Sequence, residues 1–112
     1  MSINKKRLHR KRRIRAKISG TAIRPRLSVF RSLNNIYVQV IDDENGKTLL
    51  SVNLKEAAKK NDVAGAAKVG KLVADKCKKA KIEKIVFDRS GYKYHGKVKA
   101  IAEEARKNGL KF

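Results

Sequence analysis

Apolar and polar residues alternate through the middle of the chain, a pattern typical of strands with one buried face. Residues 27–32 (LSVFRS) predict a first strand, residues 36–41 (IYVQVI) a second and residues 47–52 (KTLLSV) a third. Residues 33–35 contain an asparagine pair and residues 43–46 end in Asn-Gly, so both segments predict tight turns. The folded part of the chain is therefore expected to open as an antiparallel meander.

After the meander, apolar residues recur at steps of three and four, which predicts a helix. This stripe spans residues 63–77 and follows Asp62, a good N-cap. It contains several small residues, which we expect to pack closely on the sheet. Residues 82–87 (IEKIVF) predict a fourth strand. Because a crossover helix separates it from the meander, we expect this strand to run parallel to a neighbour.

An apolar face near the C-terminus predicts a last helix and consists of Val98, Ile101, Ala102 and Ala105. Gly109 is the expected end of this helix, and Leu110 and Phe112 can pack back on the core. The element order βββαβα predicts an α+β fold. Its mixed sheet would combine the antiparallel meander with one parallel strand and would be packed by two helices.

Charge divides the chain into two parts. The 112 residues carry a net charge of +20, and residues 1–26 hold 11 of the 30 Lys and Arg residues but no acid. We therefore predict a basic N-terminal arm over residues 1–26, disordered alone or helical on RNA, and a single α/β RNA-binding domain over residues 27–112. A solvated tail or a localisation signal is the alternative for the arm. A membrane-surface helix is disfavoured, because the arm lacks Trp and Phe.

Composition excludes several classes of protein. No apolar run approaches the ~20 residues that a membrane-spanning helix needs, and no apolar segment follows the basic N-terminus as it would in a secretory signal. The single cysteine, Cys77, falls on the apolar helical stripe, so we expect a core residue in a reducing, cytoplasmic setting. The large positive charge favours a polyanionic partner, with nucleic acid as the first candidate.

The segment between the fourth strand and the last helix carries the most informative side chains. Residues 88–97 (DRSGYKYHGK) lie at the carboxyl end of a strand, where binding sites tend to form. Tyrosine rings can stack on unpaired bases, and Arg or Lys can reach phosphates. One of the two tyrosines has the alternative of filling the edge of the sheet. The predicted RNA-binding residues of this segment are Arg89, Tyr92, Lys93, Tyr94, His95 and Lys97.

Further basic residues are predicted to bind RNA at the first strand and in the arm. Arg24 and Arg26 flank a proline that stiffens the entry to the strand. Arg31 and Ser32 lie at its far end, where a guanidinium suits phosphate. Arg31 has the alternative of pairing with an acid such as Asp42. In the arm, the predicted contacts are Arg7, Arg10, Arg12, Arg13 and Arg15.

Catalysis is not predicted. The acids near strand ends are Asp42, Asp43, Glu44 and Asp88. A metal nuclease needs several carboxylates that converge on ions ~4 Å apart, whereas these acids are already explained by a turn and a strand end. His95 lacks an evident nucleophile partner. No phosphate-loop, dinucleotide or zinc spacing occurs, so no cofactor, metal or small-molecule substrate is predicted, and a nuclease is the minor alternative.

Three stretches carry a resemblance to a known family: residues 24–32 (RPRLSVFRS), 36–42 (IYVQVID) and 86–100 (VFDRSGYKYHGKVKA). With them, nearly the whole chain resembles bacterial large-subunit ribosomal protein eighteen. The resemblance implies a ribosomal protein of the central protuberance that binds 5S rRNA, contacts 23S rRNA and lies near large-subunit ribosomal protein five. Two positions depart from the family pattern. Residues 33–35 lack the basic residue that many relatives have there, and Ser90 stands where glycine is common.

The sequence therefore predicts a non-catalytic RNA scaffold that is a monomer when free. The basic arm would supply most of the affinity, and the strand-end segments would position the domain and read the shape of the RNA. The alternative is an architectural protein that coats DNA or RNA without a preferred target.

Overall fold

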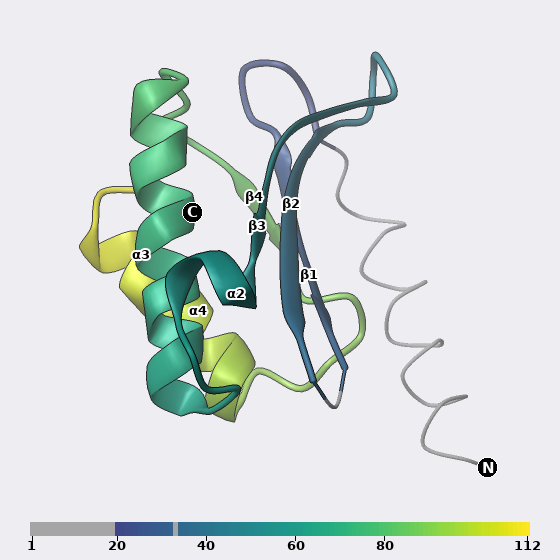
Figure 1. The fold of residues 1–112 in the computed structure, drawn as a ribbon. Helices are drawn as coiled ribbons and strands as arrows, with labels where there is room; N and C mark the ends of the chain where they lie inside the picture. The colour runs from purple at the N-terminus through teal and green to yellow at the C-terminus, as the bar shows by residue number, and fades with distance from the viewer. Residues whose placement is uncertain (1–19, 33) are drawn as a thin grey trace, which may run out of the picture.

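The structure, a computed structural model, describes residues 20–32 and 34–112. Along the chain the elements are β1 (Arg26–Arg31), β2 (Ile36–Asp42), β3 (Lys47–Asn53), α2 (Leu54–Ala57), α3 (Val63–Lys79), β4 (Val86–Asp88) and α4 (Gly96–Lys107). The strands form one sheet in the order β3-β2-β1-β4, and the helices lie together on one side of it (Figure 1). The predicted α+β fold is confirmed.

Strand β1 joins the antiparallel and parallel parts of the sheet. It is antiparallel to β2, where Val29 lies opposite Val38, and parallel to β4, where Leu27 lies opposite Phe87. Strands β2 and β3 continue the meander, with an irregularity after Val40. The meander and the parallel fourth strand are therefore both as predicted, and α3 supplies the crossover between β3 and β4.

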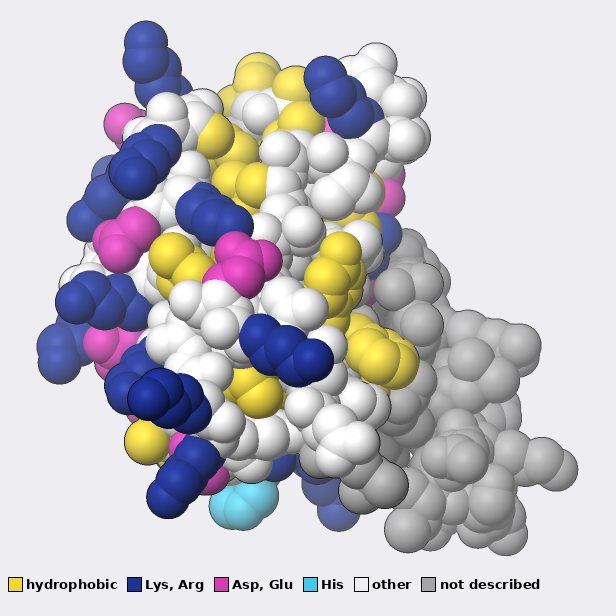
Figure 2. All heavy atoms as spheres, in the orientation of Figure 1, with side chains coloured by type: hydrophobic (Ala, Val, Ile, Leu, Met, Phe, Trp, Pro, Cys, Tyr) yellow, Lys and Arg dark blue, Asp and Glu magenta, His cyan; other side chains and the backbone are white. Residues whose placement is uncertain are grey.

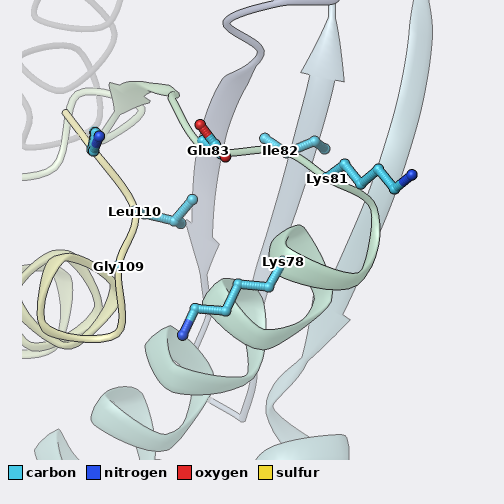
Figure 3. Close-up of a pocket in the computed structure, with 7 residues that line it drawn as sticks. Lys78, Lys81, Ile82, Glu83, Gly109 and Leu110 are labelled. Atoms are coloured by element: carbon cyan, nitrogen blue, oxygen red, sulfur yellow. The ribbon is translucent and has the colours of Figure 1, made fainter.

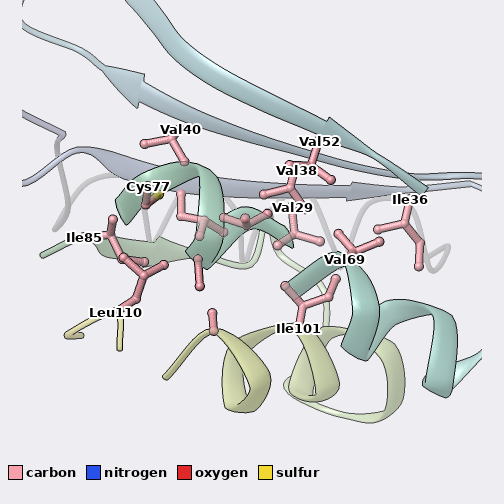
Figure 4. Packing of buried hydrophobic residues seen from close by; sticks show 14 of the residues in the cluster. Val29, Ile36, Val38, Val40, Val52, Val69, Cys77, Ile85, Ile101 and Leu110 are labelled. Atoms are coloured by element: carbon pink, nitrogen blue, oxygen red, sulfur yellow. The ribbon is translucent and has the colours of Figure 1, made fainter. Parts of the chain in front are cut away.

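The hydrophobic core lies between the helices and one face of the sheet (Figure 4). The strands contribute mainly β-branched residues, and α3 and α4 contribute small and branched ones. The buried members from these elements are Leu27, Val29, Ile36, Val38, Val40, Val52, Ala66, Val69, Val73, Ala74, Cys77, Ile101 and Ala105. Leu110 is buried in the same cluster and Phe112 packs against it, as the sequence predicts.

The opposite face of the sheet has a different character. Residues that alternate with the core positions point to it, among them Ser28 and Phe30 of β1 and their partners Gln39 and Tyr37 of β2. Phe30 is 52% exposed, and the helices of the described part of the chain lie on the other side (Figure 1). One face of the sheet thus forms the core, and the other mixes aromatic and polar side chains.

Helices α3 and α4 approach each other closely at Gly70. A Cβ atom on Gly70 would stand 2.5 Å from the carbonyl oxygen of Ile101, which is shorter than any normal contact. The expectation that the small residues of α3 pack on the sheet is therefore wrong at this position. Gly70 is small because the backbone of α4 lies against it.

Two local predictions need correction. The fourth strand is shorter than residues 82–87, because the chain first pairs with the C-terminal segment. The Ile85 N–H donates to the Lys111 carbonyl at 3.1 Å, and the Lys111 N–H donates to the Glu83 carbonyl at 3.0 Å. The structure also adds the short helix α2, which the sequence reading missed. Its signal is a capping box, in which Asn53 and Glu56 cap each other's backbone.

Other local predictions are confirmed. The Asp62 side chain accepts a hydrogen bond from the Gly65 N–H at 2.7 Å at the start of α3. Gly109 follows the end of α4 with φ +110°, a conformation that favours glycine. Cys77 is fully buried in the core, and burial raises the pKa of its thiol to about 11, so the thiol stays protonated and unreactive near neutral pH.

The close contact between α3 and α4 predicts the sign of one substitution. Replacing a helical glycine by alanine normally stabilises a protein by about 0.5–1 kcal/mol. We expect Gly70→Ala instead to lower the free energy of unfolding by about 1–3 kcal/mol, because the added methyl group overlaps α4. Urea denaturation measures this, with the exposed neighbour Lys71→Ala as a control that changes stability by less than about 0.5 kcal/mol. A more stable Gly70→Ala variant would contradict the described helix contact.

Candidate nucleic-acid interface

Arg26 lies between two carboxylates that come from distant parts of the chain. Its Nε and Nη2 each donate to Asp43 at 3.0 Å, and its Nη1 donates to Oδ2 of Asp88 at 2.7 Å. In the antiparallel pair, Arg26 lies opposite Ile41, two residues before Asp43. In the parallel pair it lies opposite Val86, two residues before Asp88. The register of the sheet therefore brings both acids to this guanidinium.

This cluster of Arg26, Asp43 and Asp88, which we call the Arg26 brace, is shielded from water except at Asp43. The side chains are 11%, 29% and 0% exposed, respectively. The hydrogen bonds that Arg26 donates to Asp43 raise the pKa of Arg26 against the opposing effect of burial, and Asp88 raises it further. A bidentate guanidinium–carboxylate pair is strong and directional. Arg26, which the sequence reading assigns to RNA contact, thus holds the fold together.

The brace also holds the start of the described chain. The Gly20 N–H donates to Asp43 Oδ2 at 2.6 Å, and the Asp43 N–H donates to the Gly20 carbonyl at 3.0 Å. A Cβ atom on Gly20 would stand 2.5 Å from both the Arg26 nitrogen and the Ile41 oxygen. Only glycine fits there, so Gly20 anchors the segment that precedes β1.

On the other side, the brace supports the start of the 89–95 loop, which connects β4 to α4. The Ser90 N–H donates to Oδ1 of Asp88 at 2.8 Å, while Oδ2 of Asp88 accepts from Arg26. Ser90 adopts φ 55°, a region that favours glycine. Its hydroxyl lies 3.2 Å from the Ser28 hydroxyl, which gives the serine a contact that glycine would lack.

Tyr92 fixes the middle of the loop to the end of β1. Its hydroxyl donates to the Arg31 carbonyl at 2.9 Å and accepts from the Arg31 N–H at 3.3 Å. The Arg31 guanidinium lies 5.4 Å from the centre of the Tyr92 ring. Of the two tyrosines, Tyr92 is therefore the one that closes the edge of the sheet. The alternative pairing of Arg31 with Asp42 is wrong, because the two residues lie at opposite ends of the β1–β2 pair.

The next side chains of the loop face solvent. Lys93, Tyr94 and His95 are all exposed, and Tyr94 is 39% exposed. The Tyr94 ring meets the edge of Phe87 at 6.5 Å between centroids and an interplanar angle of 86°. One side of this ring is thus supported by the core while much of it remains open.

The structure places the predicted site residues in different parts of the molecule. Arg31, Ser32 and the 89–95 loop meet at one end of the sheet, which we call the loop surface. Arg24 is exposed at the opposite end of β1, about 17 Å away for a six-residue strand. Arg89 and Lys97 are half-buried at the two ends of the loop. The predicted arm contacts, within residues 7–15, lie outside the described residues.

Three of the four acids near the strand ends are engaged within the chain. Asp42 accepts from the Glu44 N–H at 3.1 Å and from the Asn45 side chain at 2.7 Å, which shapes the turn after β2. Asp43 and Asp88 serve the Arg26 brace. Within residues 20–32 and 34–112, no group of three or more His, Cys, Asp or Glu side chains is placed to hold a metal ion. These carboxylates therefore have structural roles.

The surface is strongly cationic. Lys and Arg side chains spread over the helix side of the molecule, with acidic side chains between them (Figure 2). Among the residues that the structure describes, no helix is both long and apolar enough to cross a membrane. The arrangement suits contact with an extended polyanion over several parts of the surface.

The sequence reading missed the partners of Arg26. Asp88 directly follows an apolar strand, and a buried carboxylate at such a place requires a cation or several N–H donors. The sequence therefore indicates that Asp88 has a cationic or N–H partner. It does not indicate which of the 30 basic residues is that partner, because the answer depends on the register of β1 with β4. For the same reason, the sequence alone explains Asp43 only as part of the turn.

Comparisons with known proteins give a consistent result. The family described as "Ribosomal L18 of archaea, bacteria, mitoch. and chloroplast" matches residues 1–112. The chain is similar to large ribosomal subunit protein uL18 of Ruminiclostridium cellulolyticum, with 55% identity over 115 residues, 97% of this chain and 94% of the relative. It is 56% identical, with the same coverage, to the protein of the same name from Leuconostoc mesenteroides. It is 53% identical to the protein of that name from Myxococcus xanthus, over 95% of this chain and 94% of the relative.

The Arg26 brace predicts a large cost for one substitution. We expect Arg26→Gln to lower the free energy of unfolding by about 3–5 kcal/mol, because the buried Asp88 carboxylate loses its cation. Arg26→Lys keeps the positive charge but lacks the bidentate geometry. Its free energy of unfolding should therefore lie between those of Arg26→Gln and the parent. Thermal and urea unfolding measure both. The exposed Arg24→Gln, which removes the same charge, should change stability by less than about 0.5 kcal/mol. Equal effects of Arg24→Gln and Arg26→Gln would contradict the brace.

Proposed function

The chain belongs to the ribosomal L18 family, and from that premise we propose that it is a non-catalytic constituent of the large ribosomal subunit that binds 5S rRNA. In this proposal it helps to attach 5S rRNA to 23S rRNA in the central protuberance of cytoplasmic ribosomes and lies near large-subunit ribosomal protein five. The ribosome then supplies the negative charge that balances the net charge of +20.

The loop surface is the observation that carries the proposal. Tyr92 and Asp88 fix the loop from within. The side chains that follow, Lys93, Tyr94 and His95, therefore have a defined position while remaining exposed. A rigid loop that presents a cation and a half-open aromatic ring suits RNA, because the ring can stack on an unpaired base and the cation can reach a phosphate.

Different basic residues have different roles in this proposal. Arg31, Ser32 and the 89–95 loop bind RNA at one end of the sheet, and Arg24 adds a contact at the other. Arg26 acts through the fold, because its partners Asp43 and Asp88 hold Gly20 and the start of the 89–95 loop. The basic arm supplies the largest part of the electrostatic affinity, which gives a steep dependence on salt if about six to ten phosphates are engaged.

Recognition in this proposal depends mainly on shape. The deep, narrow major groove of A-form RNA hides base edges from side chains. Backbone contacts from a rigid domain therefore discriminate between RNAs through the positions of their phosphates, and stacking by Tyr94 adds selectivity for an unpaired base.

The half-open ring of Tyr94 predicts a loss of RNA affinity in a domain that stays folded. We expect Tyr94→Ala to weaken 5S rRNA binding by about 1–3 kcal/mol and to lower the free energy of unfolding by about 0.5–1.5 kcal/mol, because the edge contact with Phe87 is lost. Tyr94→Phe keeps the ring and should retain affinity. Tyr92→Phe is the converse control, because loss of its hydroxyl should cost about 1 kcal/mol of stability through the Arg31 backbone. Unchanged affinity in Tyr94→Ala would remove stacking from the proposal.

Competition for the RNA target tests the function itself. Labelled 5S rRNA is titrated with the full chain at ~150 mM salt with magnesium and is then competed with duplex RNA of equal length and with transfer RNA. We expect 5S rRNA to be preferred over both by about a hundredfold or more. Equal competition would indicate that charge alone explains binding, as in a protein that coats nucleic acid without a preferred target.

A further inference from the structure

Helix α3 ends in a turn that is unusual for the residue it contains. The Ile82 N–H donates to the Cys77 carbonyl at 2.8 Å, and the Lys81 N–H donates to the Lys78 carbonyl at 3.1 Å. These two bonds form a Schellman motif, whose central residue takes a left-handed conformation and is usually glycine. Here that residue is Lys81, with φ 61°.

Helix α4 ends in the same motif with the usual residue. The Leu110 N–H donates to the Ala105 carbonyl and the Gly109 N–H to the Arg106 carbonyl, each at 3.1 Å. Gly109 has φ +110° and occupies the position that Lys81 occupies in α3. The chain thus uses glycine in one helix end and accepts a strained lysine in the other.

A pocket of about 490 Å³ lies between the two helix ends (Figure 3). Lys78, Lys81 and Lys111 line it, Ile82 and Leu110 give it an apolar part, and Glu83 is the single acid of its lining. The three lysines are exposed. The Lys78 side chain runs toward the turn at Gly109, where its Cε lies 3.2 Å from the position of a Cβ atom on that glycine. The pocket is concave and carries a net positive charge.

The helix dipole does not explain the whole cluster. Lysines in the last turn of a helix stabilise its negative end, and Lys78 serves α3 in this way. Lys81 and Lys111 lie beyond the helices, and Lys81 has a backbone conformation that costs stability. The helix-end carbonyls of Cys77 and Ala105 already accept hydrogen bonds, which reduces their repulsion of an anion.

We propose that this pocket binds the phosphodiester backbone of RNA at a second place, separate from the loop surface. Three lysines contribute to the lining of one concavity, and its net positive charge suits the phosphates of an RNA backbone. The inference rests on the proposed function in one respect, since ribosomal RNA is then the polyanion that the chain meets.

Geometry separates the pocket from the loop surface. The loop ends at His95, directly before α4, and Gly109 follows the other end of that helix. Twelve helical residues span about 18 Å. A phosphate bound in the pocket is therefore not one that Lys93 or Tyr94 can reach, so the pocket engages a different stretch of backbone.

The test uses the full chain with a short, labelled RNA duplex as the probe, with and without saturating 5S rRNA. We expect the duplex to bind the chain that already carries 5S rRNA. The triple variant Lys78→Gln, Lys81→Gln, Lys111→Gln should weaken this binding roughly tenfold and leave the 5S rRNA affinity unchanged. The matched control is Lys59→Gln, Lys60→Gln, Lys68→Gln, which removes the same charge from exposed lysines around another pocket and should have little effect.

Several results would overturn the proposal. Equal weakening by both triple variants would show a general effect of charge. A loss of 5S rRNA affinity in the pocket variant alone would make the pocket part of the first surface. Displacement of the duplex by millimolar inorganic phosphate would assign the pocket to small anions. If the parent chain lacks a preference for 5S rRNA, the proposed function fails, whereas the difference in duplex binding between the pocket variant and the control variant still tests the pocket.

A single substitution at Lys81 distinguishes the effect of backbone strain on stability from the effect of the side chain on RNA binding. We expect Lys81→Gly to raise the Tm by about 4–8 °C, because glycine relieves the left-handed conformation, and at the same time to weaken duplex binding. A purely structural role for Lys81 predicts the gain in Tm without the loss of binding, and that result would overturn the proposal.

Discussion

The Arg26 guanidinium between Asp43 and Asp88 is the interaction on which the arrangement of the surface depends. A single side chain in β1 pairs with the turn after β2 and with the end of β4, and through these acids it also holds Gly20 and Ser90. Because Asp88 is fully buried, its charge is stabilised by this cation, which the register of the sheet places beside it. The segment before β1 and the 89–95 loop therefore share one internal anchor.

This constraint divides the basic residues by role. The Arg26 side chain forms ion pairs inside the fold. In contrast, Arg31, Lys93 and the neighbouring loop residues remain at the surface in positions that the fold defines. Tyr92 also has a structural role, because its hydroxyl bonds to the backbone of Arg31 at the end of β1. Tyr94 is then the tyrosine whose ring is exposed and can stack on a base. A rigid loop of this kind loses little conformational entropy on binding RNA.

The sequence is sufficient for most of the elements, although not for α2 or the bounds of β4, and for most of the fold. Alternation along residues 27–52 and the helical spacing in 63–77 reflect which side chains are buried, so strands, helices and the parallel fourth strand followed from them. What could not be predicted depends on contacts between distant segments. The brace requires the register of β1 with two neighbours, and the closeness at Gly70 requires the path of α4. The family resemblance was likewise visible in motifs, whereas the division of roles among the arginines was not.

The most direct test of this division follows the arginine side chains by NMR, through their Nε–Hε signals, as 5S rRNA is added to the full chain. The account predicts that the Arg26 signal is protected from exchange with water in the free protein and keeps its position in the complex, because Asp43 and Asp88 hold it. The signals of Arg31 and Arg89 should shift. A shift of Arg26 as large as that of Arg31, or rapid exchange of Arg26 with water in the free protein, would contradict the account.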